Sequence, residues 1–304
     1  MQEVEQRGVS TPSGGCREYG RICVSNPGLQ AKLAKMRDIL RELKRVAVGF
    51  SAGVDSTFLL KVAVDALGPA NVVAVTADSE SLTRAELDEA RKLTAQMGVE
   101  HAIVRTDEMD DPNYRANPAN RCYYCKQALF RKLDEFSAQR GSMVMVIGVN
   151  TDDFADWRPG LQASKEKGVR MPAAEAGMSK ADVRELSREM GLPTHDKPSS
   201  PCLASRLPYG EEITPEKLTQ IERSEAFLHS IGFAVCRVRH HGNMARIEVP
   251  TDQIERLCEP ATRARIDAAL REFGYQYVAV DIRGFRSGSL NEMLSPSQTG
   301  VQTK

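Results

Sequence analysis

The chain contains 304 residues, of which 41% are apolar and 27% are charged, and its 41 basic residues balance 41 acidic ones. This composition is typical of a globular protein with about two domains and argues against collagen-like, mucin-like and disordered chains. The zero net charge argues against a nucleic-acid-binding field over the whole molecule. Because no apolar stretch reaches about 18 residues and the N-terminus lacks an apolar core, neither a membrane span nor a secretory signal is expected.

Seven cysteines occur, an odd number in a long chain without an export signal. These features favour a reducing cytoplasm in which the thiols are free or act as ligands, rather than a disulfide framework. We therefore predict a cytoplasmic protein, and we assign no functional role to Cys16, Cys23, Cys236 and Cys258.

The first half of the chain alternates apolar runs with helical patterns. Residues 1–28 show little periodicity and predict a tail, whereas Leu29–Lys44 has apolar residues at helical spacing. The next predicted strands are Arg45–Phe50, Asn71–Thr76, His101–Thr106 and Ser142–Val149, and the predicted helices between them are Thr57–Leu67, Thr83–Met97 and Cys122–Ala138. This order predicts an α/β fold, a parallel doubly wound sheet with its active site at the carboxyl ends of the strands.

The pattern changes after about residue 200. The sequence there predicts a helix, a hairpin, a second helix and a strand, over Thr214–Ile231, Ala234–Arg239 with Ala245–Val249, Ala261–Phe273 and Tyr277–Ile282. We therefore predict an α/β domain over residues 29–200, a smaller C-terminal α+β domain over residues 201–295 and a frayed tail over residues 296–304. His240 and His241 fall in the predicted hairpin turn and are expected at the surface.

The segment SAGVDS follows the first predicted strand. Small residues let backbone N–H groups approach an anion, and free N–H groups at a helix start bind phosphate. Because no lysine follows, this is not the P-loop of kinases and GTPases. The segment is similar to the SGGxDS loop of the ATP pyrophosphatase (PP-loop) superfamily, whose members split ATP into AMP and pyrophosphate. Ala52 replaces the second glycine of that pattern, so we expect a negative φ at this residue.

This loop predicts an ATP site that also holds Mg²⁺ through Asp55. Asn150, Asp152 and Asp153 follow the most apolar strand, where they contact magnesium or ribose or belong to a solvated acidic loop. The residues predicted to bind the nucleotide are Ser51, Gly53, Val54, Asp55, Ser56 and Thr76.

Three cysteines stand in motifs of their own. Cys122 and Cys125 form the CxxC pair of RCYYCK, and Cys202 lies in KPSSPCLASR. Three thiolates leave one position open on a zinc ion, and on a [4Fe–4S] cluster they leave one iron free. A buried pair one helical turn apart is the alternative interpretation, so the residues themselves leave the kind of site open.

Several cationic groups follow these cysteines. Ser205 and Arg206 come within one turn of Cys202, which places a hydroxyl, a guanidinium and a thiol close together. Arg237 and Arg239 alternate on one predicted strand and share a face. Two guanidinium groups on one face suit a phosphate or a carboxylate, although a solvated strand face has the same pattern.

Taken in order, the motifs SAGVDS, RCYYCK, GVNTDD, CLASR, VRVRHHGN and RGFRSGSLN resemble the LarE family from about residue 30 to residue 294. LarE enzymes are ATP-dependent sulfur transferases that help to make the nickel-pincer nucleotide of lactate racemase. The resemblance implies that ATP adenylates a carboxylate of pyridinium-3,5-biscarboxylic acid mononucleotide and that sulfur then displaces AMP, which leaves a thiocarboxylate. It also implies a substrate site at Ser205, Arg206, Arg237 and Arg239.

The resemblance implies two possible sulfur sources. In single-cysteine members the residue matching Cys202 gives up its own sulfur and the enzyme works once. In three-cysteine members the residues matching Cys122, Cys125 and Cys202 hold a [4Fe–4S] cluster that carries an extra sulfide. This sequence has all three cysteines. We therefore expect the cluster-bearing type, a homo-oligomer that works with other nickel-pincer biosynthesis enzymes and binds neither membranes nor nucleic acid.

Three alternatives remain open from the sequence. A PP-loop tRNA thiolase can also carry three cysteines, but zero net charge and the lack of an evident RNA-binding appendage argue against it. An amide-forming ligase of the NAD-synthetase kind would use the same loop with the cysteines as bystanders. A non-catalytic iron–sulfur or zinc module would release no pyrophosphate.

Overall fold

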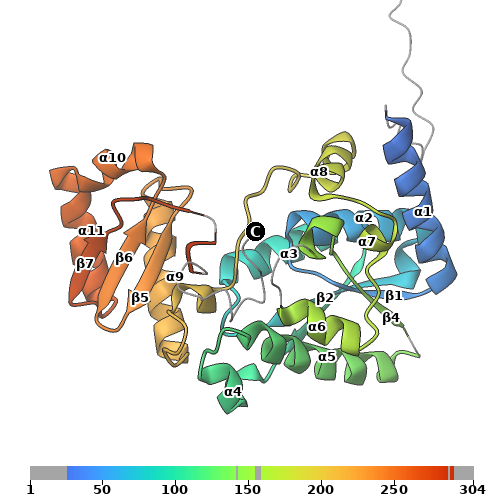
Figure 1. Cartoon of the computed structure of the whole chain (residues 1–304), viewed down its shortest axis with the longest axis horizontal. Coiled ribbons are helices and arrows are strands. Elements are labelled where there is room, and N and C mark those ends of the chain that lie inside the picture. Colours follow the sequence, from blue (N-terminus) through green and yellow to red (C-terminus); the bar gives the residue numbers. More distant parts are fainter. Residues whose placement is uncertain (1–25, 142, 155–158, 287, 291–304) are drawn as a thin grey trace, which may run out of the picture.

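The computed structural model describes residues 26–141, 143–154, 159–286 and 288–290. The molecule is elongated, and its two sheets lie toward opposite ends of the long axis (Figure 1). The predicted C-terminal tail lies outside the described residues. At the other end, helix α1 spans Pro27–Leu43, because Pro27 occupies its first turn and the Asn26 side chain accepts a hydrogen bond from Gly28 N. The helix therefore begins two residues before the predicted start.

The predicted parallel sheet is confirmed. Its four strands run in the order β3-β2-β1-β4 and every neighbouring pair is parallel. Because β2 and β4 lie on opposite sides of β1, the connections diverge at β1 and leave a crevice at its carboxyl end. The strands are β1 (Val46–Gly49), β2 (Val72–Asp78), β3 (Glu100–Arg105) and β4 (Val144–Ile147).

Helices cover both faces of this sheet (Figure 1). Val46 and Val48 of β1 pack into one core cluster and Ala47, between them, packs into the other, as alternation along a strand requires. The first cluster includes α1, α2 (Val54–Leu67), α3 (Arg84–Gln96), α7 (Pro172–Glu175) and α8 (Lys180–Glu189), and the second includes α5 (Arg121–Gln139) and α6 (Pro159–Glu166). The short helix α4 spans Pro112–Arg115.

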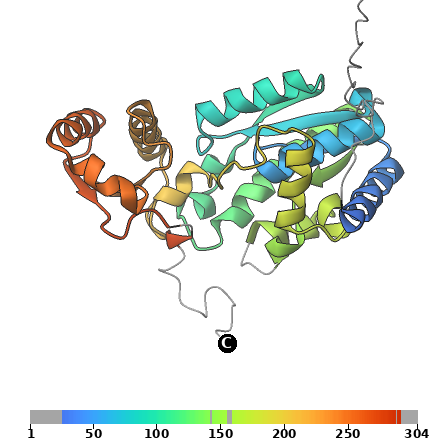
Figure 2. The same ribbon diagram turned by 90° about the horizontal axis from the view of Figure 1, so that it is seen from above.

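The predicted order of C-terminal elements is also present. Helix α9 (Pro215–Ser230) precedes β5 (Arg237–His241) and β6 (Met244–Glu248), followed by α10 (Ile254–Cys258), α11 (Pro260–Glu272) and β7 (Tyr277–Val280). Strand β6 pairs antiparallel with β5 and parallel with β7. Leu228 of α9, Leu270 of α11 and Val238 of β5 share a core cluster that is separate from those of the parallel sheet, and Figure 2 shows this part set to one side.

The hairpin turn is shorter than predicted. Strand β5 continues through His241, and only Gly242, with φ of +59°, and Asn243 form the turn. His240 is 2% exposed rather than at the surface, and its ring contacts the side chains of Glu211 and Gln220. Its expected surface position was therefore wrong. Within the described ranges, no helix combines the length and apolar character needed to cross a membrane.

Candidate active site

The SAGVDS segment (residues 51–56), which we call the glycine turn, closes the crevice at the carboxyl end of β1. The Ser56 hydroxyl donates to the carbonyl of Gly53 (3.2 Å) and accepts a hydrogen bond from the backbone N–H of Ser51 (3.3 Å). Helix α2 begins at Val54, and no side chain of the described residues caps it at Gly53. Its first-turn N–H groups are therefore available to an anion.

Ala52 corrects one sequence expectation. Its φ is +53°, in the left-handed region, and its side chain is fully buried. The turn from β1 into α2 needs this conformation, which explains the glycine of the superfamily pattern at the same place. The alanine methyl costs about 1–2 kcal/mol in this region, and surrounding contacts must offset that cost.

Gly148 lets β4 approach the start of α2. A Cβ at residue 148 would lie 2.6 Å from the backbone carbon of Asp55 and 2.7 Å from the backbone nitrogen of Ser56. Any side chain here would therefore displace the glycine turn. Gly148 was not among the predicted site residues, although a glycine after the most apolar strand indicates close backbone approach.

Asp55 has two partners that come from distant parts of the chain. Asn150 donates from Nδ2 to one carboxylate oxygen (3.1 Å), and the ammonium group of Lys180 pairs with the other. Asp152 and Asp153 support this arrangement: Asp152 accepts from the backbone N–H of Lys180 (3.0 Å) and Asp153 from that of Asn150 (3.0 Å). Sequence reasoning placed Asn150 correctly at the strand ends and missed Lys180.

Thr76 lies at the same edge of the sheet, and its hydroxyl is already engaged. It donates to the carbonyl of Phe50 (2.9 Å) and lies 2.8 Å from Nε2 of His101. Since the Thr76 proton is committed, His101 Nε2 carries the donating proton. Burial, with a smaller contribution from Arg91, lowers the pKa of His101.

The three cysteines lie in one region. Cys122 and Cys125 occupy the first two turns of α5, and Cys125 packs with Cys202 against the cluster around Tyr114 and Leu203. Burial raises the pKa of Cys125, and the negative charges of Glu108, Cys202 and Cys122 raise it further. Within the described chain, no three His, Cys, Asp or Glu side chains converge closely enough to hold a metal.

A short segment around Cys202 is held at both of its ends. On the N-terminal side of Cys202, Lys197 donates from Nζ to the carbonyl of Ala52 in the glycine turn (3.1 Å). After Cys202, the backbone N–H of Leu203 donates to the carbonyl of Ser81 (2.9 Å), three residues beyond the end of β2. Lys197 and Cys202 are five positions apart in the chain, which limits their Cα separation to about 17 Å. We call residues 197–203 the cysteine strap.

A cavity of about 270 Å³ lies between the end of β2 and the start of α9. Its lining includes Asp78, Ser79, Arg84 and Glu222, and the backbone N–H of Arg84 donates to Glu222 (2.7 Å) across it. The Ser79 hydroxyl contacts that of Ser81, on which the strap is anchored. The cavity and the anchor of the strap thus share the segment that follows β2, at the carboxyl edge of the sheet.

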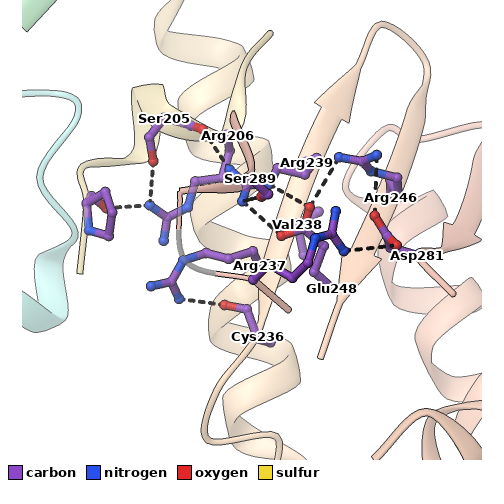
Figure 3. A network of polar contacts seen from close by, with 12 residues as sticks. Ser205, Arg206, Cys236, Arg237, Val238, Arg239, Arg246, Glu248, Asp281 and Ser289 are labelled. Atoms are coloured by element: carbon purple, nitrogen blue, oxygen red, sulfur yellow. Dashed lines mark hydrogen bonds and ion pairs between the residues drawn. The ribbon is translucent and has the colours of Figure 1, made fainter. Parts of the chain in front are cut away.

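Arg206 holds the C-terminal end of the strap (Figure 3). Its Nε and Nη2 atoms donate to the two carboxylate oxygens of Glu225 over 3.0 and 2.9 Å. Its Nη1 atom donates to the carbonyl of Cys202 and the hydroxyl of Ser205, each over 3.0 Å. Arg206 therefore lies against the Cys202 backbone and the Ser205 hydroxyl, and its guanidinium is engaged by protein groups.

Arg239 is engaged in the same way (Figure 3). It donates to both carboxylate oxygens of buried Glu248 (3.0 and 2.8 Å), to the carbonyl of Ser205 (2.9 Å) and to the hydroxyl of Ser289 (2.8 Å). Arg237 differs, because its guanidinium donates to the carbonyls of Cys236 (2.6 Å) and Ser199 (3.1 Å). Burial and the charge of Arg206 lower the pKa of Arg237, so a bound anion would relieve it.

The comparisons with known proteins agree with this geometry. A family model described as NAD synthase matches residues 30–151, which span the parallel sheet and the glycine turn. A glutamine-dependent NAD(+) synthetase of Aquifex aeolicus is 34% identical over 120 residues, 36% of this chain and 20% of its own length. The family-model match therefore lies within the nucleotide-binding half of the molecule.

Two relatives match over nearly their whole length. An uncharacterized protein of Synechocystis is 45% identical over 88% of this chain and 99% of its own. The pyridinium-3,5-bisthiocarboxylic acid mononucleotide synthase of Lactiplantibacillus plantarum is 38% identical over 89% of this chain and 97% of its own. The chain therefore belongs to the LarE family, within the superfamily that includes NAD synthase.

Proposed function

We propose that the chain inserts sulfur into pyridinium-3,5-biscarboxylic acid mononucleotide at the expense of ATP. The carrying observation is the cysteine strap, which contacts the glycine turn through Lys197 and ends beside β2 at Leu203. A phosphate site and a thiol thus share one edge of the sheet. The name of the Lactiplantibacillus relative supports the choice of substrate.

Adenylation takes place at the glycine turn. ATP phosphates bind the free N–H groups of the first turn of α2, with Ser51, Gly53, Val54 and Ser56 around them. A carboxylate oxygen of the substrate attacks the α-phosphorus, and the bond to pyrophosphate breaks. Asp55 would hold Mg²⁺, which when bound supplies positive charge between the phosphates. Lys180 already lies against Asp55 and supplies a second cation for the departing pyrophosphate.

Sulfur transfer follows beside the strap. A sulfur nucleophile attacks the acyl carbon, the bond from that carbon to the AMP oxygen breaks, and AMP leaves as an anion. Arg206 fixes the strap by holding the Cys202 carbonyl and is itself held by Glu225. Arg237 offers the most available charge for the substrate phosphate, with Ser205 and Arg239 beside it.

We propose that Cys122, Cys125 and Cys202 bind a [4Fe–4S] cluster. Three thiols are the right donors: Cys122 and Cys125 lie one turn apart on α5, and Cys125 and Cys202 pack against the same core cluster. When bound, such a cluster supplies an iron with an open position for a sulfide. Among the described residues the three side chains do not converge on a single metal ion, whereas the ligands of a four-iron cluster are bound to different irons and lie farther apart.

The test compares Cys202→Ala with the wild type under anaerobic conditions after reconstitution with iron and sulfide. The variant is expected to release pyrophosphate yet form no thiocarboxylate, measured by phosphate assay and mass spectrometry. Wild-type turnover by the variant, with neither protein forming a thiocarboxylate, would favour an amide-forming ligase. Intact mass separates the sulfur sources: an unchanged chain after many turnovers supports the cluster, whereas loss of H₂S from the chain shows that Cys202 is consumed.

We also propose an oligomeric state, a cellular compartment and partner enzymes for this reaction. A homo-oligomer in the cytoplasm, working with other nickel-pincer biosynthesis enzymes, fits the composition and the family. A tRNA thiolase remains the second candidate, because PP-loop enzymes of that class share the loop. Salt-dependent binding of tRNA, together with no measurable affinity for the mononucleotide, would favour the thiolase.

A further inference from the structure

Buried arginines of this chain fall into two groups. Among the residues that the structure describes, three arginines are buried: Arg121, Arg206 and Arg239. Arg206 and Arg239 each donate two hydrogen bonds to a buried carboxylate, of Glu225 and Glu248 respectively. Their charges are therefore balanced within the protein. Arg121 is the exception.

Arg121 is 4% exposed and has only neutral partners. Its Nη1 atom donates to Oδ1 of Asn117 (2.7 Å), and its guanidinium lies 5.2 Å from the centre of the Tyr209 ring. Its Nε atom is buried without a hydrogen-bond partner, and over the described ranges no carboxylate forms an ion pair with it. A buried charge without a counter-charge is strongly unfavourable.

The groups around Arg121 identify the missing anion. Cys122 follows Arg121 directly in the first turn of α5. The first turn of α6 lies against the same cysteine, since a Cβ at Gly160 would lie 3.5 Å from the Cys122 carbonyl oxygen. A helix N-terminus carries partial positive charge. Arg121 and the first turn of α6 thus both lie beside Cys122.

We propose that Arg121 is the counter-charge for the thiolates of the three-cysteine site, an inference that rests on the proposed ligand set. Metal ligation removes the thiol protons and leaves negative charge on Cys122, Cys125 and Cys202. Arg121 balances part of that charge once a metal is bound. Before ligation its charge is unbalanced, so the free chain carries a cost that ligation recovers.

Co²⁺ alone is the probe for this role. It is titrated into the metal-free full chain under anaerobic conditions, and binding is followed by the thiolate-to-cobalt charge-transfer absorption. Arg121→Met is expected to bind Co²⁺ at least about tenfold more weakly than the wild type, and Arg121→Lys to recover most of the affinity. Arg115→Met is the matched control, because Arg115 is exposed in the preceding helix. Equal Co²⁺ affinities of Arg121→Met and wild type would overturn the proposal.

Thermal unfolding of the metal-free proteins separates this role from a structural one. Metal-free Arg121→Met is expected to unfold at the wild-type temperature or above it, because an apolar side chain replaces an unbalanced charge. A lower unfolding temperature would show that Arg121 serves packing and would contradict the proposal. If iron and sulfide give no cluster while Co²⁺ still binds the thiolates, the cluster assignment fails and the role of Arg121 stands. If the wild type shows no thiolate–cobalt absorption, the role of Arg121 fails.

Discussion

Asn150 donates a hydrogen bond from Nδ2 to Oδ1 of Asp55 over 3.1 Å and so joins the segment after β4 to the first turn of α2. The two residues are 95 positions apart in the chain, and they meet because β1 and β4 are parallel neighbours. Their contact fixes the direction of the Asp55 carboxylate before any nucleotide arrives. The acidic group of the crevice is therefore preorganised by sheet topology.

The first prediction concerns the charge of Asp55. Asp55→Asn keeps the shape of the side chain but removes the negative charge that would hold Mg²⁺. Pyrophosphate release is expected to fall at least about 100-fold, a size typical for loss of a charge-stabilising group. The control is Asp65→Asn on the same helix, where Asp65 pairs with Lys61 away from the turn. Unchanged release by Asp55→Asn would reject the assignment of the loop.

The second prediction concerns backbone approach at Gly148. Gly148→Ala would place a methyl group 2.6–2.8 Å from backbone atoms of Asp55 and Ser56, so the turn must shift. We expect a higher KM for ATP and a kcat at least about tenfold lower, because small displacements of binding groups are costly. Gly28→Ala is the control, since its nearest contact is a side-chain oxygen of Asn26 at 3.3 Å. Wild-type kinetics in Gly148→Ala would show that the approach is not rigid.

The third prediction concerns the left-handed residue of the turn. Ala52→Gly is expected to keep pyrophosphate release, because glycine adopts φ of +53° without strain. Ala52→Val places a branched side chain in the same conformation and is expected to lower the free energy of unfolding by about 2 kcal/mol. Urea denaturation measures the change, with ATP binding measured in parallel. Equal stability of the valine and glycine variants would argue against the observed backbone.

The fourth prediction concerns the pH dependence of stability. Burial lowers the pKa of His101 below its ordinary value of 6.5, so the unfolded chain binds more protons just below that pH. The free energy of unfolding therefore rises with pH through this window and levels off above it. His101→Gln is expected to reduce the slope without abolishing it, because burial also lowers the pKa of His240 and His241. An unchanged slope in urea titrations across pH 5–7 would contradict the shift at His101.

The sheet could be predicted because its strands carry their own pattern. Val46–Gly49 is a short apolar run between a helix and a small-residue turn, and each parallel partner repeats that order. The positions of Ser51 and Asn150 at the strand ends followed directly. Lys180 could not be found in this way, because its ion pair with Asp55 depends on where α8 packs on the sheet.

The partners of Arg237 and Arg239 could not be predicted from the sequence pattern either. Glu248 lies directly opposite Arg237 in the β5–β6 register, yet it pairs with Arg239, whose direct partner is Arg246. Diagonal pairs of this kind depend on strand twist and on what covers the sheet. The residues of the predicted anion site were therefore identified, while the carboxylates that occupy two of them were not.

Residues 281–289, near the C-terminus, contact side chains of β5 and β6, which precede them in the chain. Asp281, just beyond β7, pairs with Arg246 at 3.4 Å, and Ser289 accepts a hydrogen bond from Arg239 over 2.8 Å. During synthesis the nucleotide-binding half can leave the ribosome and fold while these two groups are still untranslated. A prematurely terminated chain would thus lack both groups that hold Arg239 and Arg246 from the C-terminal side.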